Sequence, residues 1–329
     1  MSNTSATTPY VVEDYRGMLQ VYSDGSIVRS YPQNLNVGVH EDGSVIWKDV
    51  TFDPIHGLQL RLYKPSSAIT STKLPIFYYI HGGGFCLSSC TWPMYQNCCF
   101  RLASDLQVIV VSPDYRLAPE NRLPAAIEDG FAAVKWLQAQ ALSDNPDTWL
   151  TDVADFNRVF ISGESAGGNI AHHLAVGLGE GWPELAPVRV RGYVYLSAYF
   201  GGTQRLRSEM EGGKKVCSIW RLLDRFWSMS IPVGETRDHP SVNPFGLACP
   251  SLEPVALDPI LAVVGSYDIL KDRIEDFVRR LKEWGKKIEY VEFEREDHGF
   301  FVIHPNSEAS KKLMEIIKRF ITKNSSNQS

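Results

Sequence analysis

The residues best suited to chemistry lie in one short glycine-rich turn. Residues 163–167 read Gly-Glu-Ser-Ala-Gly, which places Ser165 between two glycines. An apolar run precedes the turn at 159–162, and a helix-like segment follows it at 169–178. A strand, a sharp turn and a helix in this order expose the hydroxyl of the central serine at the edge of a sheet. The spacing therefore predicts a nucleophile at Ser165; a purely structural glycine turn is the alternative.

A serine nucleophile needs N–H donors for the negative charge that develops on the carbonyl oxygen of its substrate. Residues 81–84 read His-Gly-Gly-Gly and directly follow an apolar run at 74–80. Consecutive glycines leave their amides unshielded, so those of Gly83 and Gly84 can converge with that of Ala166 on one oxygen. We predict these three amides as an oxyanion hole, and a merely flexible glycine loop is the alternative.

The serine also needs a base and a group that orients the base. In folds with this turn, the acid and then the histidine follow the serine along the chain. His298 comes after an apolar run at 288–293, and two carboxylates, Asp268 and Asp272, come after a run at 259–265. We favour Asp268 as the acid because it is closer to the strand end and has apolar neighbours. Asp272 is expected to cap the helix that follows.

The elements that must position these residues alternate between short apolar runs and longer helical ones. Continuous apolar strands joined by crossover helices predict an α/β fold with a mostly parallel, doubly wound sheet and helices on both faces. The predicted strands span residues 45–52, 58–63, 74–80, 108–112, 159–162, 192–197, 259–265 and 288–293, and the predicted helices span 95–105, 124–140, 169–178, 273–284 and 307–322. We predict a single domain over residues 1–329.

Two segments depart from this alternation. Near the start, residues 11–22 have a helix-like pattern, and a turn at 23–26 predicts a hairpin. The insertion at about 203–250 contains apolar residues at helical spacing over 219–227. An insertion of this kind after a sheet strand predicts a lid over the strand ends, and a helix that only packs on the core is the alternative.

Composition favours an ordinary soluble protein. The chain is 44% hydrophobic and 22% charged, with a net charge of -5, which gives no reason to expect nucleic acid or a membrane surface as partner. It has neither a secretory start nor an apolar run of the roughly 18 residues that a membrane span needs. We therefore expect a cytoplasmic protein, with the nucleus as the alternative, and disordered tails at about 1–9 and 323–329.

The six cysteines lack the spacing of a metal or redox site. No Cys-x-x-Cys pair occurs, and no paired histidines lie near the cysteines. We expect reduced thiols, no metal and no cofactor.

Three motifs, at residues 81–84, 112–120 and 163–168, occur in a fixed order and spacing. Together they resemble the hormone-sensitive-lipase branch of the α/β-hydrolases. Within it, the chain is similar to the plant carboxylesterases, whose relatives include the gibberellin receptors and the hydroxyisoflavanone dehydratases. Further matches to the plant branch lie at 123–126, 236–239 and 243–244, and the stretches 17–21 and 188–194 are most similar to the strigolactone-hydrolysing carboxylesterases.

The resemblance covers nearly the whole chain, from Gly17 to about Phe320. It implies a catalytic triad of Ser165, Asp268 and His298, with the oxyanion hole predicted above. It also implies that the N-terminal segment, about 11–31, folds over the pocket as a second piece of the lid. One departure is Glu164, which stands where many relatives carry aspartate.

The expected function is hydrolysis of a small apolar carboxylic ester or lactone through an acyl-enzyme at Ser165, by a monomer or homodimer. Two alternatives are a hormone receptor of the gibberellin-receptor type and a dehydratase or lyase. By the resemblance, the receptors have lost the histidine that His298 matches, and the dehydratases carry threonine in place of the serine, so both residues favour hydrolysis. Apolar and aromatic side chains are expected to line the pocket. The candidates are Phe85, Trp92, Tyr199, Phe200, Phe226, Trp227 and Phe301.

Overall fold

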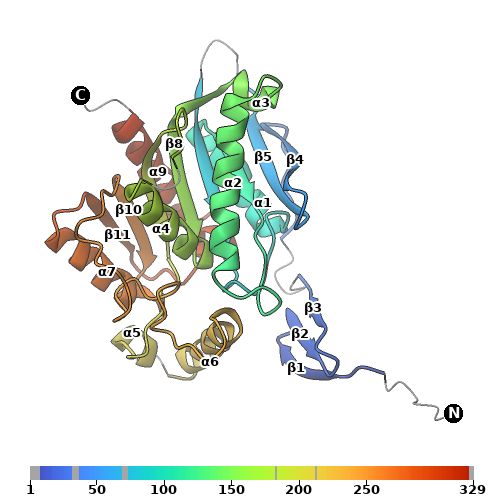
Figure 1. Cartoon of the computed structure of the whole chain (residues 1–329), viewed down its shortest axis with the longest axis vertical. Coiled ribbons are helices and arrows are strands. Elements are labelled where there is room, and N and C mark those ends of the chain that lie inside the picture. The colour runs from blue at the N-terminus through green and yellow to red at the C-terminus, as the bar shows by residue number, and fades with distance from the viewer. Residues whose placement is uncertain (1–7, 32–36, 69–72, 182–183, 212, 326–329) are drawn as a thin grey trace. The chain divides into compact units, whose positions relative to one another are not determined.

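The computed structural model describes residues 8–31, 37–68, 73–181, 184–211 and 213–325. Its contacts divide the chain into two compact units, Met1–Gly38 and Val39–Ser329. Helices and strands are labelled in Figure 1. The α/β pattern predicted from the sequence lies in the second unit.

The first unit contains a three-stranded antiparallel sheet of β1 (Val11–Tyr15), β2 (Leu19–Tyr22) and β3 (Ile27–Arg29). The helix expected over 11–22 is therefore wrong. Arg16 and Gly17 adopt positive φ angles of 55° and 70°, and the amide N–H of Gly17 donates to Asp14 Oδ1 at 2.7 Å. This turn reverses the chain after a single short strand. The hairpin expected after residue 22 is confirmed, and the role of this segment as a lid stays a prediction.

The second unit is organised around one eight-stranded sheet (Figure 1). Its strands are β4 (Val45–Asp53), β5 (Leu58–Pro65), β6 (Leu74–Ile80), β7 (Ile109–Pro113), β8 (Ala154–Glu164), β9 (Val190–Leu196), β10 (Ile260–Gly265) and β11 (Ile288–Phe293). In space they follow the order β11-β10-β9-β8-β6-β7-β5-β4. β5 pairs antiparallel with β4 and with β7, and the other neighbours are parallel. The mostly parallel sheet expected from the sequence is confirmed.

Helices cover both faces of this sheet. One core packs α2 (Ala125–Leu142), α4 (Ala166–Gly179) and α7 (Lys271–Glu283) on one face, and a second core packs α1 (Pro93–Leu106) and α9 (Glu308–Ser325) on the other. Figure 1 shows α2 and α4 in front of the strands. Successive residues of β8 alternate between the two cores, as strand geometry requires: Ile161 joins the first and Phe160 the second. The central strands are thus apolar on both faces.

Three short helices were not expected, because four residues are too few to show a helical period. They are α3 (Thr148–Thr151), α5 (Arg207–Met210) and α8 (Phe300–Ile303). Of the two expected disordered tails, residues 1–7 and 326–329 lie outside the described residues. Helix α9 continues to Ser325, so the chain from residue 323 to that point is helical rather than disordered.

The insertion after β9 forms α5 and α6 (Gly213–Ser230), which confirms the helix expected over 219–227. Helix α6 is amphipathic: Trp220, Phe226 and Trp227 are buried, whereas Arg221 and Asp224 are exposed. Its buried side packs against loops at the carboxyl ends of the strands, as described below. Nowhere in the described residues does a helix have the length and apolar character needed to cross a membrane.

Candidate active site

Ser165 sits at the junction of β8 and α4, in a backbone conformation that few residues adopt. Its φ is 53° and its ψ is -115°, directly after the last residue of β8 and before the first of α4. A Cβ on Gly163 would lie 2.0 Å from the carbonyl oxygen of Gly167, and a Cβ on Gly167 would lie 2.1 Å from that of Ile80. Only glycine fits at both positions. The turn therefore places Ser165 where the positive end of the α4 dipole can act on it.

The predicted oxyanion loop begins beside this turn. Strands β6 and β8 run parallel with Ile80 opposite Gly163, so residues 81–84 leave the sheet next to Ser165. Gly83 and Gly84 have φ angles of 110° and 61°, a region that other residues rarely enter. Among the described residues, the amides of Gly83, Gly84 and Ala166 donate to no other group. These three donors are free to bind an anion.

The loop after β7 braces the oxyanion loop. The Tyr115 hydroxyl donates to the carbonyl oxygens of His81 and Gly82 at 3.1 and 3.0 Å, and its ring stacks on His81 at 4.3 Å. Asp114 accepts from the amide of Cys90 at 2.6 Å and lies 3.4 Å from His81 Nε2. Burial raises the pKa of Asp114, but its contacts with His81, Cys90 and Ser89 together outweigh burial and the net shift is downward. These contacts hold the loop in one conformation.

Arg116, which also belongs to the motif at 112–120, binds helix α2 rather than the oxyanion loop. Its backbone amide and its side chain both bind the buried carboxylate of Asp129 in α2, at 2.7 and 2.9 Å. It anchors the loop to the helix layer and makes no hydrogen bond with residues 81–84 in the described part of the chain.

The candidate base and acid follow neighbouring strands. β10 and β11 are parallel, with Gly265 opposite Phe293, so the loops that carry Asp268 and His298 leave the sheet side by side. His298 Nδ1 lies 2.9 Å from Asp268 Oδ2. The Asp268 carboxylate is fully buried and also accepts from the backbone amide of Leu270 at 2.9 Å. A proton on Nδ1 that is held in this way leaves Nε2 to exchange a proton with substrate.

The pKa of His298 is set by opposing effects. Burial disfavours the charged imidazolium, whereas the Asp268 carboxylate beside Nδ1 favours it, and the net result raises the pKa to about 9. His298 Nε2 lies 3.5 Å from Glu164 Oε1, a second carboxylate that favours the charged form. Ser165 Oγ makes no hydrogen bond with His298 among the described residues; such bonds often tighten only when substrate binds.

The helix-capping role expected for Asp272 is wrong. Helix α7 begins at Lys271, so Asp272 lies inside its first turn rather than before it. Its carboxylate instead accepts from the backbone amide of Ser208 in α5 at 2.7 Å. Asp272 therefore ties α7 to the insertion.

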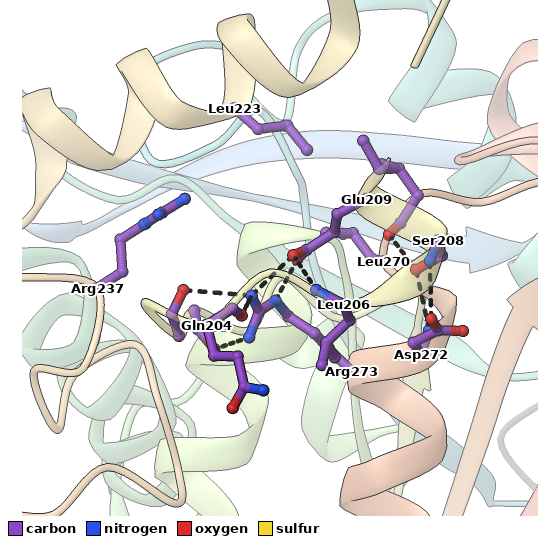
Figure 2. A network of polar contacts seen from close by, with 12 residues as sticks. Gln204, Leu206, Ser208, Glu209, Leu223, Arg237, Leu270, Asp272 and Arg273 are labelled. Carbon is purple, nitrogen blue, oxygen red and sulfur yellow. Dashed lines mark hydrogen bonds and ion pairs between the residues drawn. The ribbon is translucent and has the colours of Figure 1, made fainter. Parts of the chain in front are cut away.

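A buried ion pair fastens the insertion to α7 (Figure 2). Arg273 pairs with Glu209 of α5, and their side chains are 9% and 0% exposed. The guanidinium also donates to the carbonyl oxygens of Gly201 at 2.7 Å and Gln204 at 2.9 Å. Nothing in the local sequence signals this pair, because its partners lie 64 positions apart. The network fixes α5 beside the loop that carries Asp268.

Four of the expected pocket residues gather around the oxyanion loop. The rings of Tyr199 and Trp227 stack at 3.8 Å, and Phe85 lies 5.9 Å from Trp227. A Cβ on Gly84 would meet the Phe226 ring at 2.4 Å, so α6 lies directly against the loop. Part of the insertion thus packs against the candidate oxyanion loop, and its role as a lid stays a prediction.

The other three expected pocket residues make different contacts. Phe200 stacks on Phe277 at 4.9 Å, and Phe301 packs edge-on against Phe300 at 5.5 Å. Trp92 is half-buried at the start of α1, against the second core. The contacts of Phe200 and Phe301 are those of core side chains. A substrate-binding role for any of the seven stays a prediction.

A cavity of about 700 Å³ borders Asp268. Ser208 of α5, Ile219 of α6 and Tyr267 line it, together with the start of α7. Its volume falls within the roughly 300–1,000 Å³ of small-molecule sites. The sequence did not indicate this cavity, because its walls come from segments that only the folded chain brings together.

Comparison with known proteins places these features in one family. A family model described as the alpha/beta hydrolase fold matches residues 77–302, which include the oxyanion loop, Ser165, Asp268 and His298. The chain is 35% identical to carboxylesterase 20 of Arabidopsis thaliana over 311 residues, 91% of this chain and 93% of that protein. It is 34% identical to the gibberellin receptor GID1C of the same plant over 286 residues, 83% of this chain and 79% of the receptor.

Solved structures agree with this assignment. An esterase of Pyrobaculum calidifontis superimposes with a TM-score of 0.70 at 27% identity, over 88% of this chain and 87% of that one. The chain belongs to the α/β-hydrolase family and is a hydrolase enzyme, and the resemblance to the plant branch is confirmed.

Proposed function

We propose that the protein is a serine carboxylesterase in which Ser165, His298 and Asp268 form the catalytic triad. The observation that carries the proposal is the 2.9 Å contact between His298 Nδ1 and the buried Asp268 carboxylate, on loops at the same sheet edge as Ser165. The similarity to a plant carboxylesterase and to an archaeal esterase supports the same reaction class.

In the first half-reaction, Ser165 Oγ attacks the carbonyl carbon of the ester and His298 Nε2 takes the hydroxyl proton. The carbonyl oxygen becomes an oxyanion, which the amides of Gly83, Gly84 and Ala166 bind. The bond from carbonyl carbon to alcohol oxygen then breaks. His298 returns its proton to the alcohol, which leaves an acyl group on Ser165.

In the second half-reaction, water attacks the acyl carbon while His298 removes one of its protons. The same three amides bind the second oxyanion. Collapse of this intermediate breaks the bond to Ser165 Oγ, which regains its proton from His298. The products are a carboxylic acid, an alcohol and free enzyme; from a lactone, acid and alcohol are one molecule.

We infer a small apolar ester or lactone as substrate. The lid helix α6 brings Phe226 and Trp227 against the oxyanion loop, so an acyl group bound there would meet aromatic surface. The cavity beside Asp268 offers space for a compact leaving group. Strigolactones fit this class because they are lactones, and the resemblance of residues 17–21 and 188–194 to strigolactone-hydrolysing carboxylesterases leads us to include them among the proposed substrates.

The proposal is tested by hydrolysis of p-nitrophenyl esters from acetyl to octanoyl and of plant lactones, with purified wild-type protein and Ser165→Ala. We expect turnover that falls with the longest acyl chains and is abolished in Ser165→Ala. Equal rates in the two proteins would contradict the proposal. Mass spectrometry of the products separates hydrolysis from dehydration, which would yield a product lighter by one water and no acyl-enzyme.

The similarity to GID1C makes a receptor the second candidate. A receptor needs only to hold its ligand, whereas this chain keeps a histidine paired to a buried carboxylate beside a serine turn with free amide donors. Binding of a hormone without turnover of any ester in the panel would favour the receptor.

A further inference from the structure

Glu164 is a buried carboxylate at the centre of the site with no part in the reaction as written above. It precedes Ser165, and its side chain is 6% exposed. Oε1 lies 3.5 Å from His298 Nε2, and Oε2 accepts a hydrogen bond from the Tyr95 hydroxyl at 3.2 Å. A Cβ on Gly82 would lie 1.9 Å from Oε2. The carboxylate therefore fills the space between the oxyanion loop and the catalytic histidine.

We propose that Glu164 is a positioning residue for His298: its carboxylate holds the imidazolium at Nε2 in the resting enzyme while Asp268 holds it at Nδ1. The effect of Glu164 on catalysis rests on the proposed function, in which His298 is the base. Tyr95 fixes the orientation of the carboxylate, because its hydroxyl binds the oxygen that does not face His298. The base must lose its proton and leave Glu164 before Nε2 can accept the proton of Ser165.

The groups that face this pair support the assignment. Asp268, from the loop after β10, and the exposed Asp297, from the loop after β11, both favour the charged form of His298. His81, from the loop after β6, favours the ionised form of Glu164, whereas Asp268 opposes it. Burial raises the pKa of Glu164, and its contacts with His298 and Tyr95 act in the opposite direction without cancelling burial, so the net shift is upward. Among the described residues, His298 has the largest charge effect that favours ionised Glu164.

A carboxylate within about 4–6 Å raises the pKa of a base by roughly 1 to 3 units. We expect Glu164→Gln to keep the shape of the side chain and to lower the pKa of His298 by that amount. The low-pH limb of kcat/KM for ester hydrolysis then moves down by about 1 to 3 pH units. The variant gains activity relative to wild type below neutral pH, which loss of folded protein cannot produce.

The matched control is Asp297→Asn. It removes a carboxylate next to His298 in the chain, but one that is exposed. Solvent and salt screen such a charge, so the limb should move by less than about half a unit. Profiles of Glu164→Gln and wild type that superimpose would overturn the proposal, as would equal shifts in Glu164→Gln and Asp297→Asn.

A second measurement needs neither a variant of Glu164 nor turnover. The imidazole ¹⁵N signals of His298 in the wild-type protein, assigned by comparison with His298→Gln, report protonation directly in an NMR titration. We expect an imidazolium at pH 7.5, and a neutral ring at that pH would overturn the proposal. Because this titration involves no ester, its outcome is independent of the test of the esterase reaction.

Discussion

The ion pair between Arg273 and Glu209 carries the strongest prediction about stability. Replacement of Arg273 by methionine keeps the length of the side chain and removes its charge. Among the described residues, the fully buried carboxylate of Glu209 would keep only the amide of Leu206 as a donor, at 2.9 Å. The carbonyl oxygens of Gly201 and Gln204 would lose their donors as well.

The expected cost follows from the burial of both partners. Removal of one partner from a buried ion pair costs about 3–5 kcal/mol, because an uncompensated charge remains. At roughly 2–4 °C per kcal/mol for a domain of this size class, the melting temperature should fall by about 6–20 °C. Substitution of Glu209 by glutamine in the same protein removes the stranded charge, so the double variant should recover more than about 1 kcal/mol of the loss.

The assay is urea unfolding followed by circular dichroism, with limited proteolysis to locate the loss. Arg279→Met is the matched control on the same helix, because Arg279 forms exposed ion pairs with Asp276 and Glu283 and is itself 55% exposed. The control should change the free energy of unfolding by less than about 1 kcal/mol. Arg273→Met should also be cut earlier within the insertion. Equal stability of Arg273→Met and Arg279→Met would refute the reasoning.

Three further predictions concern the site and the response to pH. Because the pKa of His298 is raised to about 9, roughly 1% of this base is neutral at pH 7. We therefore expect kcat/KM in a pH-stat assay to rise about 100-fold from pH 7 to its plateau above pH 9. A plateau already at pH 7 would contradict this. Asp268→Asn should lower kcat by about 10⁴-fold, since the histidine loses its orienting partner, and a loss below tenfold would contradict the assigned role. Burial lowers the pKa of His173 to about 4 from an ordinary 6.5. Protonation of His173 therefore leaves the free energy of unfolding unchanged above pH 6.5 and lowers it by up to about 3 kcal/mol as the pH falls through 4. Urea unfolding at pH 7 and pH 4.5 checks the last prediction, and His173→Gln should lose less stability than wild type.

The parts of the fold that could be predicted depend on local patterns. Continuous apolar strands and the glycines around Ser165 specify the central sheet and the sharp turn, because both follow from the backbone geometry of neighbouring residues. The order of motifs along the chain also predicted that Asp268 and His298 follow two successive strands, and the parallel register of β10 and β11 brings them to 2.9 Å.

The parts that could not be predicted depend on contacts between distant segments. Residues 11–22 have apolar residues compatible with a helix, but the positive φ angles at Arg16 and Gly17 make a hairpin. The partner of Arg273 lies 64 positions away, and that of Asp272 lies in the same unexpected helix, α5. The contact between Glu164 and His298 likewise joins the end of β8 to the loop after β11, and their spacing in the sequence carries no signal.

The most direct test of the central claim is covalent labelling of the nucleophile. Wild-type protein is incubated with a serine-reactive phosphonate, and the adduct is located by peptide mass spectrometry, with Ser165→Ala and His298→Gln in parallel. The account predicts one phosphonate per wild-type chain on the peptide that contains Ser165, slow labelling of His298→Gln and none of Ser165→Ala. Labelling of Ser165→Ala at the wild-type rate, or an adduct on another residue, would contradict it.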